Sequence, residues 1–323
     1  MKRIKRLKAA ALLVMAVLLF TACGSVQVNE RMFVQLMGIR EDNGITELAV
    51  QVFDSSSADA DNPVPVYKVL RGRGRSFYEA ADMIMRDSGR ELFFGHCSAI
   101  FADEDIIRDS EKLRLLSGER ISPGCPVLLS DSPEEDVSAE DENGQLIGAD
   151  RIFSVISLYR KEGLADKSDL KTVTEAADSG GFAIVPVYDG DISGCAVINM
   201  SGGTSRLSIT ETAAFDLLRG CKGIRLGVLD GSVTAGKAEK SVYYRSLENG
   251  GEYTVSLSLK CRRDEGSGPA DVYREETERI ISLSAEEICR RAAAEGFLSE
   301  LIPQYHGDED NLTFKASAEI IMK

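Results

Sequence analysis

The region from residue 253 to the C-terminus restricts the fold most strongly, because two alternating runs flank one long amphipathic segment. Apolar and polar residues alternate over 253–261 and over 312–322, a period typical of half-buried strands in an antiparallel sheet. Between these runs, Pro269 opens a helical pattern that is expected to end at about residue 302, before Pro303. One apolar stripe runs along this helix, formed by Ile281, Ala285, Ile288 and Ala292. The region therefore predicts a long helix lying on an antiparallel sheet.

The preceding part of the chain alternates strand and helix patterns. Residues 33–54 predict a hairpin, because the Asn43-Gly44 pair between two apolar runs accepts the positive φ values of a tight turn. Residues 130–150 are acidic and are predicted to form a loop. Shorter patterns predict strands at 66–70, 97–101 and 182–187 and helices at 77–87, 104–116, 151–161 and before Gly180-Gly181.

Together these patterns predict an α+β fold with mixed and antiparallel sheets and packed helices in two or three subdomains. The expected organisation is a leader over 1–22, an N-terminal region over 23–190 and a C-terminal domain over 191–323. The long amphipathic helix belongs to the C-terminal domain. A further break near 130–150 would divide the N-terminal region into two subdomains.

The leader has the features of a lipoprotein signal peptide. Five basic residues precede an apolar run over 9–20, which is shorter than the roughly 20 residues of a membrane-spanning helix. Thr21-Ala22 before Cys23 resembles the lipobox of bacterial lipoproteins, whose cysteine receives diacylglycerol before cleavage. Two acyl chains hold a protein on a membrane stably, whereas one binds only marginally. The sequence predicts lipidation of Cys23, with a plain secretory signal and a retained membrane span as the alternatives.

The charge of the chain excludes some partners. The formal net charge is −14, and it becomes −19 without the five basic residues of the leader. Such a charge argues against nucleic acid or an anionic lipid surface as an electrostatic partner. Hydrophobic residues make up 43% of the chain, enough for a core and against global disorder.

Cysteine and acidic residues give no strong metal-site pattern. The six cysteines after Cys23 are widely spaced and contain no C-x-x-C pair, so buried structural thiols are favoured over a disulfide framework. The acidic runs at 59–62 and 308–311 are the best calcium candidates. Neither run has the glycine and distal glutamate of an EF-hand loop, so both are expected to be solvated loops. We expect no metal and no cofactor.

Motifs of known enzyme classes are incomplete. Ser168 and Lys171 match an S-x-x-K motif, but its companion motifs are absent from the sequence. His96 precedes a predicted buried strand and is expected to be a structural imidazole bonded to backbone, and His306 is expected to lie in a solvated loop. The sequence therefore assembles no nucleophile with a base, and we expect a protein that is not an enzyme.

The run Arg71-Gly72-Arg73-Gly74-Arg75 is a basic spot on an acidic protein. It lacks the third glycine of a dinucleotide fingerprint and the Gly-Lys-Ser/Thr of a P-loop. The run is therefore expected to be a strand end followed by a helix that starts with a capping box of Ser76 and Glu79. A contact with a partner protein at the arginines remains an alternative.

The run Arg90-Glu91-Leu92-Phe93-Phe94-Gly95-His96 precedes a predicted buried strand. Taken in order with the segments 29–39, 72–80, 184–186, 194–197 and 207–212, it resembles the Ger(x)C family of spore germination lipoproteins. The run is the most specific of these matches, because it is close to the family's R-x-LFFGH stretch. The matching residues expected to have structural roles are Gly72, Gly74, Phe93, Phe94, Gly95, His96 and Glu211.

The resemblance implies a non-enzymatic C subunit of a nutrient germinant receptor. Such a subunit is a lipoprotein on the outer face of the cell membrane or inner spore membrane, beside integral-membrane A and B subunits. The fold it implies has three α/β subdomains, and no catalytic residues carry over. A solute-binding lipoprotein of a transporter is the alternative, although such proteins usually have two doubly wound lobes. An envelope hydrolase would require a nucleophile and base that we do not find.

Overall fold

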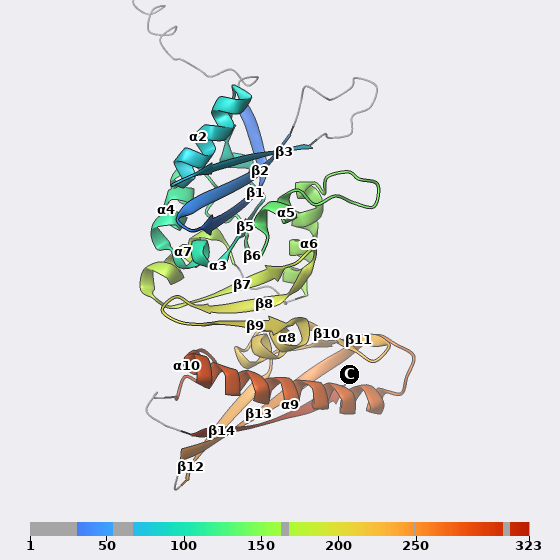
Figure 1. The fold of residues 1–323 in the computed structure, drawn as a ribbon. Helices are drawn as coiled ribbons and strands as arrows, with labels where there is room; N and C mark the ends of the chain where they lie inside the picture. Colours follow the sequence, from blue (N-terminus) through green and yellow to red (C-terminus); the bar gives the residue numbers. More distant parts are fainter. Residues whose placement is uncertain (1–30, 54–66, 163–167, 248–249, 306–310, 323) are drawn as a thin grey trace, which may run out of the picture.

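The computed structural model describes residues 31–53, 67–162, 168–247, 250–305 and 311–322. Within these residues the strands form one nine-stranded and one five-stranded sheet, which lie one above the other along the molecule (Figure 1). Helices pack on both sheets, so the predicted α+β class with mixed and antiparallel sheets is confirmed. In the same residues, none of the helices combines the length and the apolar character needed to cross a bilayer.

The larger sheet has a parallel centre and antiparallel flanks. Its strands are β1 (Arg31–Asp42), β2 (Ile45–Phe53), β3 (Tyr67–Gly74), β4 (Glu91–Phe93), β5 (Ala99–Ala102), β6 (Val127–Leu129), β7 (Phe182–Tyr188), β8 (Ile192–Asn199) and β9 (Thr204–Ser208). The order is β3-β2-β1-β5-β6-β7-β8-β9, and β4 pairs with the start of β1. β1, β5, β6 and β7 run parallel to one another, and the flanking neighbours are antiparallel.

Helices cover both faces of this sheet. One face packs against α2 (Phe77–Ser88), α3 (Glu104–Arg108), α4 (Ser110–Gly118) and α7 (Leu170–Ser179). The opposite face packs against α5 (Pro133–Val137) and α6 (Ala149–Lys161). A single-turn 3₁₀ helix, η2 (Phe94–His96), joins β4 to β5. The parallel centre of the sheet is thus buried on both sides, as parallel strands usually are.

The predicted hairpin at 33–54 is confirmed. β1 and β2 pair antiparallel, and the turn residues Asn43 and Gly44 have φ values of 51° and 77°. The helix predicted at 104–116 is two helices, because Asp109 accepts hydrogen bonds from the backbone of Glu111 and Lys112 and starts α4. The acidic segment predicted as a loop contains α5.

The smaller sheet contains β10 (Ile224–Val228), β11 (Gly231–Ala235), β12 (Glu239–Leu247), β13 (Gly250–Glu265) and β14 (Leu312–Met322). α8 (Ile209–Leu218) precedes it, and α9 (Ala270–Glu295) and α10 (Leu298–Leu301) connect β13 to β14. The alternation predicted for β13 is confirmed, with a buried residue at every second position from Gly251 to Cys261. The predicted stripe of α9 faces the core, where all four residues are fully buried.

Two predictions for this region are wrong. β14 pairs parallel to β13, with Ser317 opposite Ser256, so the sheet is mixed at this edge rather than wholly antiparallel. The long helix ends earlier than expected, because Gly296 adopts the left-handed conformation with a φ of 81° and closes α9. α10 is a separate turn, so Pro303 does not end the long helix.

α8 connects the two sheets. It lies between them in Figure 1, and its residues from Thr212 to Leu218 are all buried. One apolar cluster joins Cys195 and Leu207 of the larger sheet to α8, α9 and β13. β8 and β9 follow the junction predicted near 190, yet they pair with the larger sheet. The division into 23–190 and 191–323 stays a prediction.

Candidate functional site

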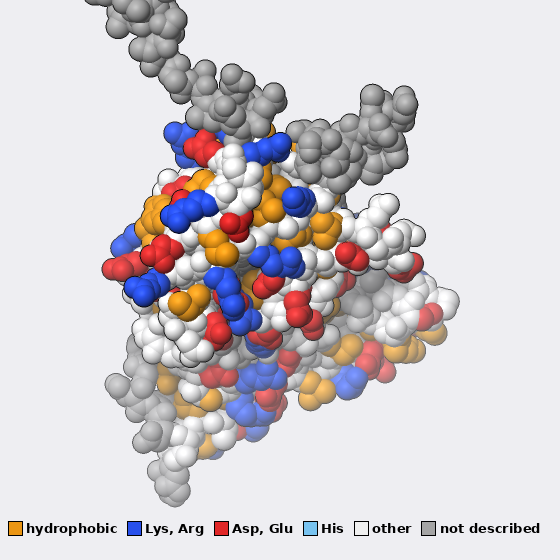
Figure 2. All heavy atoms as spheres, turned by 45° about the horizontal axis from the view of Figure 1, so that its top comes forward, with side chains coloured by type: hydrophobic (Ala, Val, Ile, Leu, Met, Phe, Trp, Pro, Cys, Tyr) orange, Lys and Arg blue, Asp and Glu red, His pale blue; other side chains and the backbone are white. Residues whose placement is uncertain are grey.

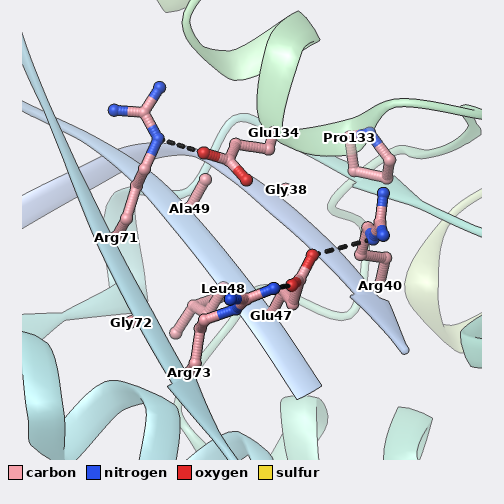
Figure 3. Close-up of a pocket in the computed structure, with 10 residues that line it drawn as sticks. All are labelled: Gly38, Arg40, Glu47, Leu48, Ala49, Arg71, Gly72, Arg73, Pro133 and Glu134. Carbon is pink, nitrogen blue, oxygen red and sulfur yellow. Dashed lines mark hydrogen bonds and ion pairs between the residues drawn. The ribbon is translucent and has the colours of Figure 1, made fainter. Parts of the chain in front are cut away.

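A hollow with a volume of about 420 Å³ lies on β1, β2 and β3 of the larger sheet, beside α5. Three arginines line it from two strands, and Figure 3 shows their side chains with the two glutamates they contact. We call it the arginine-lined hollow. Its lining residues are Gly38, Arg40, Glu47, Leu48, Ala49, Arg71, Gly72, Arg73, Pro133 and Glu134.

One row of three charged residues crosses the hollow. Glu47 of β2 lies directly opposite Arg40 of β1 on one side and Arg73 of β3 on the other. The Nε atom of Arg40 is 2.8 Å from Glu47 Oε2, and Arg73 donates to Oε1 of the same carboxylate (Figure 3). The Glu47 side chain is 9% exposed. A nearly buried carboxylate therefore holds two guanidinium groups in fixed positions.

The neighbouring row explains why the surface is hollow here. Gly38, Ala49 and Arg71 lie opposite one another on β1, β2 and β3. A Cβ atom on Gly38 would lie 2.2 Å from the carbonyl oxygen of Pro133, so only glycine lets α5 approach the sheet. Arg71 donates from Nε to Glu134 of α5, and its two Nη atoms point away from that carboxylate (Figure 3).

The hollow carries three positive and two negative side chains on a protein whose net charge is −14. Basic and acidic side chains are interspersed across the face of the molecule shown in Figure 2. Guanidinium groups bind carboxylates through two parallel hydrogen bonds. The arrangement can therefore bind the carboxylates of a partner segment. It has no histidine, cysteine or hydroxyl nucleophile among its lining residues.

Sequence reasoning identified part of this site. Arg71 and Arg73 belong to the predicted basic spot, whereas Arg40, Glu47 and Glu134 were missed. A usable signal existed for two of these, because a two-residue turn at 43–44 places residue 40 opposite residue 47. Glu134 had no such signal, since α5 reaches the hollow only through the tertiary fold.

The R-x-LFFGH motif builds a small aromatic cluster near the start of β1. Phe94 is buried and its ring centre lies 5.4 Å from that of Phe77 on α2. Phe93 and His96 are more exposed, and each packs edge-on against Phe33 of β1, at 5.7 Å and 5.4 Å. The imidazole is therefore packed against two phenylalanine rings at the surface, and the backbone hydrogen bond expected for it stays a prediction.

The two motif glycines of β3 let α2 approach the sheet. A Cβ atom on Gly72 would lie 2.1 Å from the carbonyl oxygen of Ala80, and one on Gly74 would lie 2.4 Å from Glu79 Cβ. The predicted capping box at the start of α2 is half formed. Ser76 accepts from the backbone N–H of Glu79, but the Glu79 carboxylate accepts from the N–H of Arg75 instead of Ser76.

Glu211 starts α8 with a complete capping box. Its backbone N–H donates to Ser208 Oγ, and its carboxylate accepts from the backbone N–H of Ser208 at 2.8 Å. The same carboxylate lies 2.5 Å from Arg291 on α9. The structure thus gives this motif residue a local contact and a long-range contact. Its expected structural role stays a prediction until it is tested by substitution.

A second hollow lies where the parallel strands β6 and β7 end. Asp136 lines it and accepts from Ser130 Oγ at 2.5 Å. Burial raises the pKa of Asp136 to about 6, and the negative charge of Asp189 adds to the rise, while the Ser130 hydrogen bond opposes it. Ligands of open α/β sheets often bind at such strand ends. Within the described ranges, no group of three potential metal-ligating side chains comes together.

The remaining sequence candidates do not form sites in the described residues. Ser168 is buried and donates to the carbonyl of Val127, whereas the Lys171 side chain is 67% exposed and pairs with Glu175. The S-x-x-K match is therefore not a catalytic pair. Cys23, His306 and both predicted calcium runs, apart from Asn311, lie outside the described residues.

Comparisons with known proteins identify the family. A family model described as the spore germination protein N-terminal domain matches residues 24–189, about half of the chain. A solved structure described as the crystal structure of the GerBC protein is similar with a TM-score of 0.42 and 13% sequence identity, over 88% of this chain and 96% of that one. No curated protein sequence matches the chain. On the strength of the family model, this chain belongs to the Ger(x)C family of spore germination proteins.

Proposed function

We propose that this protein is a non-enzymatic lipoprotein subunit of a nutrient germinant receptor. It is held to the membrane by lipid on Cys23 and acts through contacts with integral-membrane receptor subunits. The observation that carries the proposal is the position of the family match, which starts at residue 24, directly after the cysteine of the lipobox-like sequence.

The length of the tether supports a contact close to the membrane. β1 starts at Arg31, eight residues after Cys23. Eight extended residues span at most about 28 Å. An anchored protein therefore keeps the start of β1 close to the bilayer surface, and Arg40 in the arginine-lined hollow lies nine residues, about 30 Å, further along the same strand. The partner segments that fit are extracytoplasmic segments of integral-membrane subunits that extend this far from the bilayer.

The arginine-lined hollow is the surface we propose for this contact. Arg71 and Arg73 are 50% and 69% exposed, and β3, which carries them, is the outermost strand of the sheet. Glu47 holds Arg40 and Arg73 in position. A partner carboxylate would therefore meet guanidinium groups that are already oriented. Such pre-organisation lowers the entropic cost of binding. An acidic segment of a receptor subunit is the kind of partner that fits.

The non-enzymatic nature is supported by the chemistry of the arginine-lined hollow. Each carboxylate there is paired with a guanidinium group. These contacts favour fixed recognition over proton transfer. The antiparallel strands in both sheets also favour this proposal over the solute-binding alternative, whose members usually have two doubly wound lobes.

The proposal is tested in a spore-forming host with two variants and a control. Cys23→Ala is expected to leave the membrane fraction and to abolish germination in response to nutrients. Arg71→Gln/Arg73→Gln is expected to stay membrane-bound but to lose co-purification with receptor subunits. The control is Arg279→Gln/Arg290→Gln on α9, with the same charge change at side chains that are 60% and 57% exposed.

Two outcomes would overturn the proposal. Normal nutrient germination after deletion of the gene would remove the receptor role. Equal loss of co-purification in the β3 variant and the α9 control would show that charge alone matters, and that the arginine-lined hollow is not the contact surface. A small-molecule ligand that raises Tm strongly would favour the solute-binding alternative.

A further inference from the structure

The fold brings together two cysteines that are 28 residues apart in the sequence, Cys97 and Cys125. Cys97 leads into β5 and Cys125 leads into β6, and these strands are parallel neighbours with Ile100 opposite Val127. Both cysteine side chains belong to the same apolar cluster, on the α2 face of the sheet. The two residues therefore lie at the same end of adjacent strands and on the same face.

The two side chains are in contact. Cys125 Sγ donates to the carbonyl oxygen of Cys97 at 3.3 Å, and Cys97 Sγ donates to the carbonyl oxygen of Ala99 at the same distance. Both residues are buried, at 7% and 2% exposure. The hydrogen bond with the Cys97 side chain, followed by burial, holds the pKa of the Cys125 thiol far above its usual range. The Cys125 thiol is thus packed directly against Cys97.

We propose that Cys97 and Cys125 form a disulfide bond in the exported protein. The pairing of Ile100 with Val127 offsets Cys97 by one position from Cys125, so strand spacing alone does not bring the two cysteines together. The contact that does so is the 3.3 Å hydrogen bond from Cys125 Sγ to the Cys97 carbonyl oxygen, and a disulfide requires a Cβ separation of about 3.5–4.5 Å. The proposal rests on the proposed export for its oxidant, because disulfides persist outside the reducing cytoplasm. For this pair, the proposal replaces the structural thiols predicted from the sequence with a disulfide bond.

The bond forms by thiol–disulfide exchange with a small or protein disulfide as oxidant. One cysteine thiolate attacks a sulfur of the oxidant, which releases one thiol and leaves a mixed disulfide. The second cysteine thiolate then attacks the bound sulfur of the first and releases the second thiol. Two cysteine thiols are oxidised, the oxidant disulfide is reduced to two thiols, and both protons pass to the released thiolates. Burial and the raised pKa place this reaction during folding, before the core closes around the pair.

The bond would link the two sides of the segment that contains α3 and α4. This segment connects β5 to β6 and begins soon after the R-x-LFFGH motif, because η2 ends at His96 directly before Cys97. Closing a loop of this length restricts the unfolded chain. Reduction is therefore expected to lower Tm by roughly 5–15 °C.

The test refolds the purified, reduced full-length chain in a mixture of reduced and oxidised glutathione. The remaining thiols are alkylated, and the chain is cut after Lys and Arg without reduction. The expected product is peptide 91–108 joined to peptide 121–151, which carry Cys97 and Cys125. Cys289, buried on α9, should be recovered in alkylated form and serves as the internal control.

A second measurement uses Tm with and without reductant. The unsubstituted protein should lose stability on reduction, whereas Cys97→Ala/Cys125→Ala should not respond. Recovery of peptides 91–108 and 121–151 as separate alkylated species after refolding would overturn the disulfide. If the two peptides are linked after refolding but not in protein taken from cells, the chain can form the disulfide, and the result counts against the proposed export instead.

Discussion

The carboxylate of Glu211 lies 2.5 Å from the guanidinium group of Arg291, and this contact joins the first turn of α8 to the long helix α9. The two side chains are 19% and 32% exposed. Arg291 also donates to the backbone carbonyl of Arg206 at the end of the larger sheet. One side chain of α9 therefore contacts both the start of the connecting helix and the sheet that precedes it.

Replacing Glu211 should weaken this junction. Glu211→Ala removes both the capping contact with Ser208 and the ion pair with Arg291, so the free energy of unfolding should fall by roughly 1–2 kcal/mol. Chemical denaturation measures this change. The control Glu276→Ala removes a solvent-screened ion pair within α9 and should change the free energy of unfolding much less. An equal loss in both variants would count against a junction role for Glu211.

The second prediction concerns Arg40, Glu47 and Arg73, the row of charged residues that crosses the arginine-lined hollow. Glu47→Gln leaves Arg40 and Arg73 facing each other without a counter-charge and should cost about 1–3 kcal/mol. A double-mutant cycle with Arg73→Gln isolates the interaction between the two side chains. We expect a coupling energy of about 1 kcal/mol, since Arg73 is largely exposed. Strictly additive losses would mean that the pair contributes nothing to stability.

The third prediction concerns the close approach of the α2 backbone to Gly72 of β3. Gly72→Ala would place a Cβ atom 2.1 Å from the carbonyl oxygen of Ala80, so α2 must move and the protein should lose about 1–3 kcal/mol. Gly227 is also a strand glycine, but a Cβ atom there would meet nothing within 4 Å. Gly227→Ala should therefore be neutral or slightly stabilising. Thermal denaturation of the two variants side by side tests the difference.

Asp136 should make stability depend on pH. Its pKa of about 6 in the folded protein lies above its ordinary value of 3.8, so the folded state binds the proton more tightly. The stabilisation is present at low pH and is lost as pH rises through 6. Between pH 4 and pH 7 the protein should lose about 1 kcal/mol relative to Asp136→Asn, after allowance for partial solvent exposure. Parallel pH profiles of the two proteins would contradict the assignment.

Local chemistry explains which elements could be predicted from the sequence. The turn at Asn43-Gly44 and the alternation of β13 depend on residues close together in the chain, and both are confirmed. The direction of β14 could not be predicted, because a period of two shows which face is buried but not which way a neighbouring strand runs. Asp109 inside the predicted helix is a start signal for α4, because its carboxylate accepts hydrogen bonds from backbone N–H groups of the first turn.

The candidate site was harder to predict than the elements. The run at 71–75 showed arginines, but their meaning depends on Glu47, which lies opposite on another strand. Pairing across the hairpin could have supplied Arg40, since the turn fixes the register. The pairing of β2 with β3 and the position of α5 both depend on distant contacts. Cys97 and Cys125 show the same limit, because only the parallel pairing of β5 with β6 makes them neighbours.

The parallel pairing of β14 with β13 has a consequence for the order in which the chain becomes native. Ser256 and Ser317 pair across 61 residues, and α9 must cross the sheet before they can meet. Contacts between such distant residues form slowly, because the intervening loop must close first. The edge of β13 stays open until the last residues arrive. The smaller sheet is therefore expected to be the final part to mature, and a chain that stops short of β14 would expose an edge on which other chains can aggregate.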